Sequence, residues 1–114
     1  MAVEEYRRYI QELLLERAKR SAPGLAQMQI EAQIIFDTER DHYQLVHVGW
    51  KPNERRNYGC VLHLDIKGEK IWIQHDGTEG GIANALVEKG VPKQQIVLGF
   101  QPPSMRQYTD FAVS

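Results

Sequence analysis

Between residues 30 and 76 the sequence indicates four short strand segments, and in 30–37, 58–67 and 70–76 apolar side chains recur at every second position; this pattern constrains the fold more than any other feature of the chain. A period of two is typical of β-strands that bury one face. The segments span 30–37, 42–50, 58–67 and 70–76, and short polar or glycine-containing stretches separate them. Because strands joined by short turns pair antiparallel, the sequence predicts an antiparallel sheet.

Apolar residues at helical spacing lie on both sides of this region. The first set predicts an amphipathic helix from residue 3 to about residue 20, ended by the Pro-Gly pair at 23–24. The second set, within 82–87, predicts a shorter helix. Asp76 and Glu79 precede it with a spacing close to that of a capping box, which stabilises helix N-termini.

A short buried strand is expected at 96–98, and the tail up to Val113 is left open as a further edge strand. The order of elements is then α-β-β-β-β-α-β(-β). We therefore predict the α+β class, a mainly antiparallel sheet with two helices on one face. With 114 residues, 42% of them hydrophobic and 25% charged, the chain is ordinary for one globular domain, which we place at 1–114.

Composition also limits where the protein works and what it binds. The first 20 residues mix charged and apolar side chains, so we expect neither a signal peptide nor a membrane span. Cys60 is the only cysteine and cannot form an internal disulfide, which fits a reducing, cytoplasmic setting. The formal net charge is −1, so the molecule as a whole has no field that would hold nucleic acid or anionic lipid.

The candidate binding surface depends on the register of the third and fourth segments. If their apolar residues share one face, the opposite face carries a cluster of aromatic and polar side chains. The buried set is Cys60, Leu62, Leu64, Ile66, Ile71 and Ile73, and the opposite cluster is His63, Asp65, Trp72, Gln74 and Asp76. The cluster fits either a solvated sheet face or a partner-binding surface, because an indole beside hydrogen-bonding groups is common in binding sites.

A second candidate binding surface is a basic patch. Arg55 and Arg56 fall in the expected loop between the second and third segments, beside Trp50 and Tyr58. Arginine in such a loop can bind phosphates or an acidic protein surface, and the alternative is a solvated loop.

A metal site needs three convergent ligands, for which His63, Asp65, His75 and Asp76 are the candidates. Alternation sends His75 and Asp76 to opposite faces, so we predict no metal site and no cofactor. The remaining candidates, Asp41, His42 and His47, are assigned to a hairpin. Cys60 is expected on the apolar face, where a thiolate is disfavoured, so no catalytic residue is predicted either.

Four longer segments carry a resemblance to a known family. They are DHYQLVHVGW (41–50), RRNYGCVLHLDIK (55–67), KIWIQHDGTEGGIANALVEKGVPKQQIVLGF (70–100) and PPSMRQYTDFAV (102–113). Together they cover nearly the whole chain, and they are similar to the XisI family, named for the fdxN element excision controlling factor.

The resemblance implies a small cyanobacterial accessory protein, not itself a recombinase, that works with a XisH-like partner when a separate recombinase excises a DNA element. We therefore expect a non-enzymatic protein that binds its partner through His63, Asp65, Trp72, Gln74 and Asp76, aided by Arg55 and Arg56. The protein would contact the recombinase complex and DNA only indirectly, through its partner. A homo-oligomer is possible, and the oligomeric state is left open. The alternatives are a directly DNA-binding directionality factor and a small metal-dependent enzyme.

Overall fold

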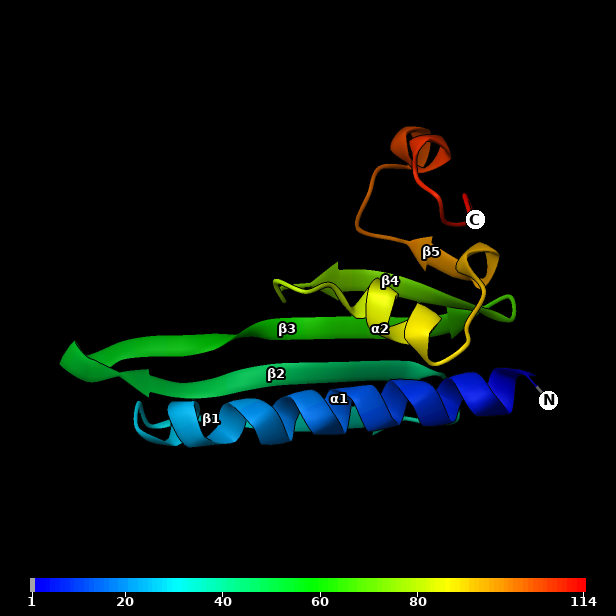
Figure 1. Cartoon of the computed structure of the whole chain (residues 1–114). Coiled ribbons are helices and arrows are strands. Elements are labelled where there is room, and N and C mark those ends of the chain that lie inside the picture. The colour runs from blue at the N-terminus through cyan, green and yellow to red at the C-terminus, as the bar shows by residue number, and fades with distance from the viewer. Residues whose placement is uncertain (1) are drawn as a thin grey trace.

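The computed structural model describes residues 2–114 and confirms the α+β class and the predicted order of elements (Figure 1). The helices and strands are α1 (Ala2–Ala26), β1 (Ile30–Asp37), β2 (His42–Lys51), β3 (Arg55–Lys67), β4 (Lys70–Asp76), α2 (Ile82–Glu88) and β5 (Ile96–Leu98). Short 3-10 helices lie at Pro52–Glu54, Lys93–Gln95 and Pro103–Tyr108. No helix in the described part of the chain is long and apolar enough to cross a membrane.

The strands form one sheet in chain order, β1-β2-β3-β4-β5. The first four pair antiparallel, as expected for hairpin connections. β5 pairs parallel to β4, and the helix α2 lies in the crossover between them (Figure 1). The further edge strand left open for the tail is not formed, because the tail makes a single bridge between Val97 and Ala112.

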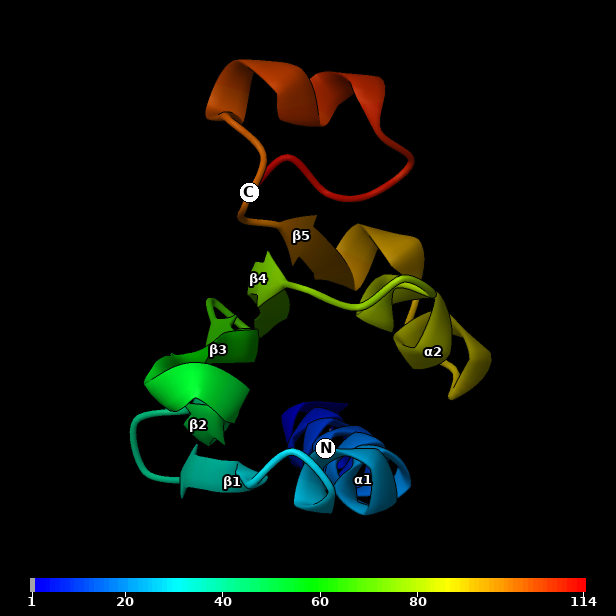
Figure 2. The same cartoon turned by 90° about the vertical axis from the view of Figure 1, so that its left-hand side faces the viewer.

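Both α-helices lie on the same side of the sheet (Figure 2). The core forms between them and the inward-facing strand residues, and its largest fully buried side chains include Ile10 and Leu14 of α1, Leu62 and Leu64 of β3 and Leu86 of α2. Within residues 2–114, no helix covers the other side of β1 to β4 (Figure 2). We call this uncovered side the open face.

Helix α1 runs six residues beyond its predicted end and includes Pro23 in its last turn. Proline there removes one main-chain hydrogen bond and disfavours helical geometry in the residue before it, which is the cost of continuing the helix. The continuation buries the side chain of Leu25, and this apolar burial explains why the Pro-Gly pair does not end the helix.

The second hairpin loop is shorter than predicted. Only Pro52–Glu54 reverses the chain, with Asn53 and Glu54 in the left-handed region, so β3 begins at Arg55. Arg55 pairs with Lys51 and Arg56 pairs with Trp50. The two arginines therefore lie on a strand, and the prediction of a flexible loop around them is wrong.

Two β-bulges change which side chains share a face. On β3, Leu45 pairs with Leu62 while Val46 pairs with Cys60, so Val61 is an extra residue. The bulge reverses the alternation, and Cys60 is exposed on the open face while Leu62 stays in the core. The prediction that Cys60 is buried with the aliphatic residues is wrong for this reason.

The second bulge lies on β4. His63 pairs with His75 while Leu64 pairs with Ile73, so Gln74 is the extra residue. The alternation beyond it is reversed, and Asp76 faces the helices, where its carboxylate accepts a hydrogen bond from the Ile82 N–H at 2.7 Å. The prediction that Asp76 shares a face with His63 is therefore wrong.

Candidate functional site

Asp65 lies on the open face, near the end of the middle strand β3. It is the one buried charged residue among residues 2–114, with 6% of its surface exposed. Its Oδ1 lies 2.8 Å from Nδ1 of His42 and 2.9 Å from Nε2 of His63. Its Oδ2 accepts a hydrogen bond from the Gln74 amide at 3.1 Å. A buried carboxylate is costly unless it is hydrogen bonded, and here both oxygens have partners.

These contacts keep Asp65 ionised. Burial by itself raises the pKa of Asp65, but the hydrogen bonds from His42, His63 and Gln74 together outweigh it, so the pKa lies below its usual value. Gln44 adds a further contact, with its amide nitrogen 3.3 Å from Nδ1 of His63. We call these five residues the Asp65 cluster.

Trp72 lies beside this cluster, since it pairs with Asp65 across β3 and β4. Two cations lie over its ring, with Lys67 Nζ at 4.4 Å and Arg106 Cζ at 5.2 Å from the ring centroid. A Cβ at Gly99 would lie 3.3 Å from the Trp72 ring. Trp72 therefore packs against the segment that follows β5, and it is only half-exposed.

A second group of side chains lies at the other end of the open face. Arg56 stacks between two rings, with its Cζ 5.1 Å from the Trp50 centroid and 5.7 Å from that of Tyr58. Tyr58 is 72% exposed and Trp50 is 49% exposed. We call Trp50, Arg56 and Tyr58 the aromatic end.

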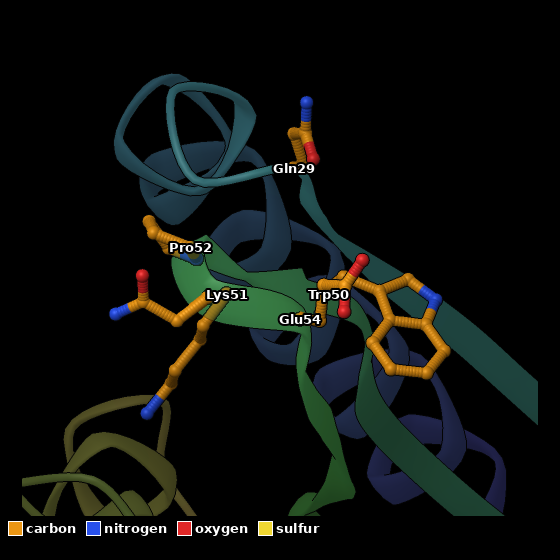
Figure 3. A pocket seen from close by; sticks show the side chains of 6 residues that line it. Gln29, Trp50, Lys51, Pro52 and Glu54 are labelled. Carbon is orange, nitrogen blue, oxygen red and sulfur yellow. The ribbon is translucent and has the colours of Figure 1, made fainter.

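The pocket at the tip of the β2–β3 hairpin does not hold a convergent set of chemical groups. It is lined by Gln29, Trp50, Lys51, Pro52, Asn53 and Glu54. In Figure 3 the Gln29 amide, the Lys51 ammonium and the Trp50 indole point away from one another. Because catalysis requires groups that converge on one substrate atom, this pocket is not a candidate active site.

Cys60 lies on the open face between the two groups and is exposed. Partial desolvation raises the pKa of its thiol, although the residue as a whole is accessible. The raised pKa disfavours the thiolate, the reactive form of the side chain.

The fold and this geometry can be compared with known proteins. A family model described as XisI protein matches residues 1–113. The chain belongs to the XisI family. This confirms the family that the sequence segments indicated.

Two solved structures are similar to this XisI-family chain over its full length. A XisI-like protein from Anabaena variabilis ATCC 29413 is 43% identical, with a TM-score of 0.90, and the match covers 98% of this chain and 99% of that one. The fdxN element excision controlling factor XisI from the same organism is 32% identical, with a TM-score of 0.86 and 100% of both chains covered. No curated protein sequence matches the chain.

In this XisI-family chain the predicted site residues separate into three places. The structure brings His63, Asp65, Gln74 and Trp72 together on the open face. Asp76 lies on the helix side, and Arg55 and Arg56 lie at the far end of the hairpin.

Sequence reasoning missed two members of the Asp65 cluster, His42 and Gln44. Both lie on β2, where His42 pairs with Asp65 and Gln44 pairs with His63. The signal was present, because antiparallel pairing of the segments 42–50 and 58–67 around a short connection places residue 42 near residue 65. The register of the third and fourth segments does not contain this pairing, which belongs to the hairpin formed by β2 and β3.

Proposed function

We propose that this chain is a non-enzymatic accessory factor in the excision of a DNA element, and that it acts by binding a XisH-like protein through the open face of its sheet. The family relationship supports the first half of the proposal. A relative that is 32% identical over its whole length is named as an excision controlling factor, which is a regulatory role. The resemblance also implied the XisH-like partner.

The observation that carries the second half is the uncovered sheet face. Exposed apolar side chains on it include Ile35 and Trp50, each 49% exposed, and Tyr58, 72% exposed. Aromatic residues that are exposed on a rigid surface are enriched at the centres of protein interfaces. The strands hold these side chains in fixed positions, so little conformational entropy is lost when a partner binds.

The Asp65 cluster adds specificity to the proposed surface. His42 has 54% of its side chain exposed, while Asp65 behind it has 9%. The imidazole therefore presents its free edge to solvent while a buried carboxylate orients it. An oriented polar group beside an apolar patch restricts which partner surfaces fit.

The test is the affinity of the purified chain for the purified XisH-like protein, measured by isothermal titration calorimetry. We expect Trp50→Ala and Tyr58→Ala each to weaken binding about tenfold or more, as for aromatic residues at an interface centre. Tyr108→Ala is the matched control, because Tyr108 is 76% exposed and lies in the 3-10 helix Pro103–Tyr108 beyond β5, far from the tip of the β2–β3 hairpin (Figure 1). Affinity unchanged by both open-face substitutions would exclude this surface.

Direct DNA binding is the competing function, and the exposure of both Arg55 and Arg56 favours it. Against it, the guanidinium of Arg56 is held between two rings and donates a hydrogen bond to the Gly49 carbonyl at 3.3 Å. DNA binding predicts a mobility shift at low salt that falls steeply with added salt and is lost in Arg55→Gln, Arg56→Gln. We expect no shift for the chain alone.

A further inference from the structure

We propose that His42, His63 and Asp65 form a binding site for one divalent transition-metal ion, with Zn²⁺ as the ion to test first. The three ligand atoms are Nδ1 of His42, Nε2 of His63 and a carboxylate oxygen of Asp65, and they lie within 4.8 Å of one another. Two imidazoles and one carboxylate form a donor set that binds zinc and other first-row ions. This inference goes beyond the proposed function and does not depend on a partner.

The sheet holds the three ligands in place before any ion arrives. His63 and Asp65 are two residues apart on β3, so they project from the same face. His42 lies opposite Asp65 on the paired strand β2. Ligands on adjacent strands need no folding step to converge, which reduces the entropic cost of binding.

Two amides occupy the positions that outer-shell partners take in metal sites. Gln44 contacts the other ring nitrogen of His63, at 3.3 Å, and Gln74 donates to the second oxygen of Asp65, at 3.1 Å. In metal sites such partners fix the tautomer of a ligating imidazole and orient a ligating carboxylate. In the present geometry the Gln44 amide nitrogen faces Nδ1 of His63; with Nε2 of His63 on the ion, the amide would turn over so that its oxygen accepts from the Nδ1–H.

The present distances are close to those of a zinc site. Zinc bonds of about 2.0–2.2 Å in a tetrahedron place ligand atoms about 3.3 Å apart. The two N···O distances here are 2.8 and 2.9 Å, so the ligands would move apart by roughly half an ångström. His42 has 54% of its side chain exposed and can make this adjustment by a small rotation.

Three protein ligands would leave one coordination position open, and the 54% exposure of the His42 side chain gives solvent access to the site. A water molecule would fill it, as in zinc sites that have three protein ligands. Nitrogen donors favour zinc, cobalt, nickel and iron over magnesium and calcium, which prefer all-oxygen sites. The proposed ligand is therefore a transition-metal ion rather than an alkaline-earth ion.

The experiment uses the full chain with any affinity tag removed. Zn²⁺ binding is measured by isothermal titration calorimetry near pH 7.5, and Co²⁺ is titrated in parallel to record its visible absorption. We expect one ion per chain and a Co²⁺ spectrum of low coordination number. His42→Ala and His63→Ala should each weaken Zn²⁺ binding about 100-fold or more, because loss of a ligand exceeds the 10–100-fold effect of losing an outer-shell partner.

His75→Gln and His47→Gln are the matched controls, since the chain has four histidines and these two lie outside the cluster. Both should bind Zn²⁺ like the parent chain. The decision rests on His42→Ala, because the exposed His42 side chain can be removed without opening the core, and circular dichroism verifies the fold. An absence of Zn²⁺ binding, which would leave a hydrogen-bonded triad only, overturns the proposal, and so does binding that survives His42→Ala.

Discussion

The guanidinium of Arg7 on α1 donates two hydrogen bonds to the carboxylate of Asp41 in the β1–β2 turn, at 2.8 and 3.0 Å. Tyr43, which is fully buried, donates its hydroxyl to the same carboxylate at 2.8 Å. This carboxylate therefore joins the first turns of the helix to the first hairpin. Both charged side chains are mostly shielded from solvent, which makes the pair stronger than a surface ion pair.

Replacing Asp41 should destabilise the fold. We expect Asp41→Gly to lower the free energy of unfolding by about 2 kcal/mol, because the buried Tyr43 hydroxyl loses its acceptor. Glycine is the substitution of choice, since the φ of +61° at this position is unstrained for glycine. Urea denaturation measures the change. Arg20→Ala is the control, because it removes an exposed pair with Glu16 and should cost less than about 0.5 kcal/mol. An equal loss of unfolding free energy in both variants would show that the Asp41 contacts do not stabilise the fold more than an exposed ion pair does.

Acid should weaken the fold through Asp41 and Asp65. The hydrogen bond from Arg7 is the main cause that lowers the pKa of Asp41, and the pKa of Asp65 is lowered by its hydrogen bonds against the effect of burial. A carboxylate whose pKa is lower in the folded chain contributes stability above its unfolded pKa of about 4, and that stability is lost as the pH falls through the folded pKa. We therefore expect the thermal midpoint to fall between about pH 5 and pH 2.

Asp65→Asn should reduce this dependence on pH, because it removes one of the two carboxylates whose protonation favours unfolding. Asp110→Asn serves as the comparison, with a side chain that is 85% exposed. A pH profile of the thermal midpoint that is the same for Asp65→Asn and the parent chain would contradict the role given to Asp65.

Gly49 is required where β2 approaches the α1–β1 turn. A Cβ at this position would overlap the Gln29 carbonyl oxygen and lie 2.7 Å from Cα of Ile30. Both are backbone atoms and cannot rotate away, so Gly49→Ala should cost about 2 kcal/mol in unfolding free energy, measured with urea. Gly59 on β3 is the control, because nothing lies within 4 Å of its Cβ position and alanine there should be tolerated. Equal stability of the two variants would argue against the close approach.

Asp76 acts on α2 and not on the open face. Its carboxylate accepts hydrogen bonds from the N–H groups of Thr78 and Ile82, at 2.9 and 2.7 Å. Asp76→Ala should cost about 1 kcal/mol, the usual effect of losing a helix cap. Glu79→Ala should change stability by less than about 0.5 kcal/mol, because Glu79 is exposed. A larger loss for Glu79 would restore the capping-box interpretation of this segment.

The order of elements was predictable because it depends on local patterns. Period-two alternation located β1 and β4, and the apolar spacing of Ile82 and Leu86 located α2. The end of α1 was not predictable in the same way, because the burial of Leu25 is a tertiary contact that outweighs the local effect of Pro23.

The candidate site was predicted in part. His63, Asp65 and Gln74 do converge, since they lie on neighbouring strands within a few residues of the β3–β4 turn. His42 was missed because its contact with Asp65 spans 23 positions of the chain and needs the register of another hairpin. Asp76 was misplaced because a bulge adds one residue, and packing against the helices, not the local sequence, decides where that residue goes.

The extra residue Val61 lets one strand serve two surfaces at once. On its N-terminal side, Tyr58 and Cys60 point to the open face. On its C-terminal side, Leu62 and Leu64 point into the core. If the same residues paired without a bulge, regular alternation would place Tyr58 and Cys60 on the side of Leu62 and Leu64, toward the helices. Deleting Val61 alone would remove the bulge and leave both residues facing outward. The position of one unpaired residue, and not only the composition of the strand, therefore determines what the molecule displays.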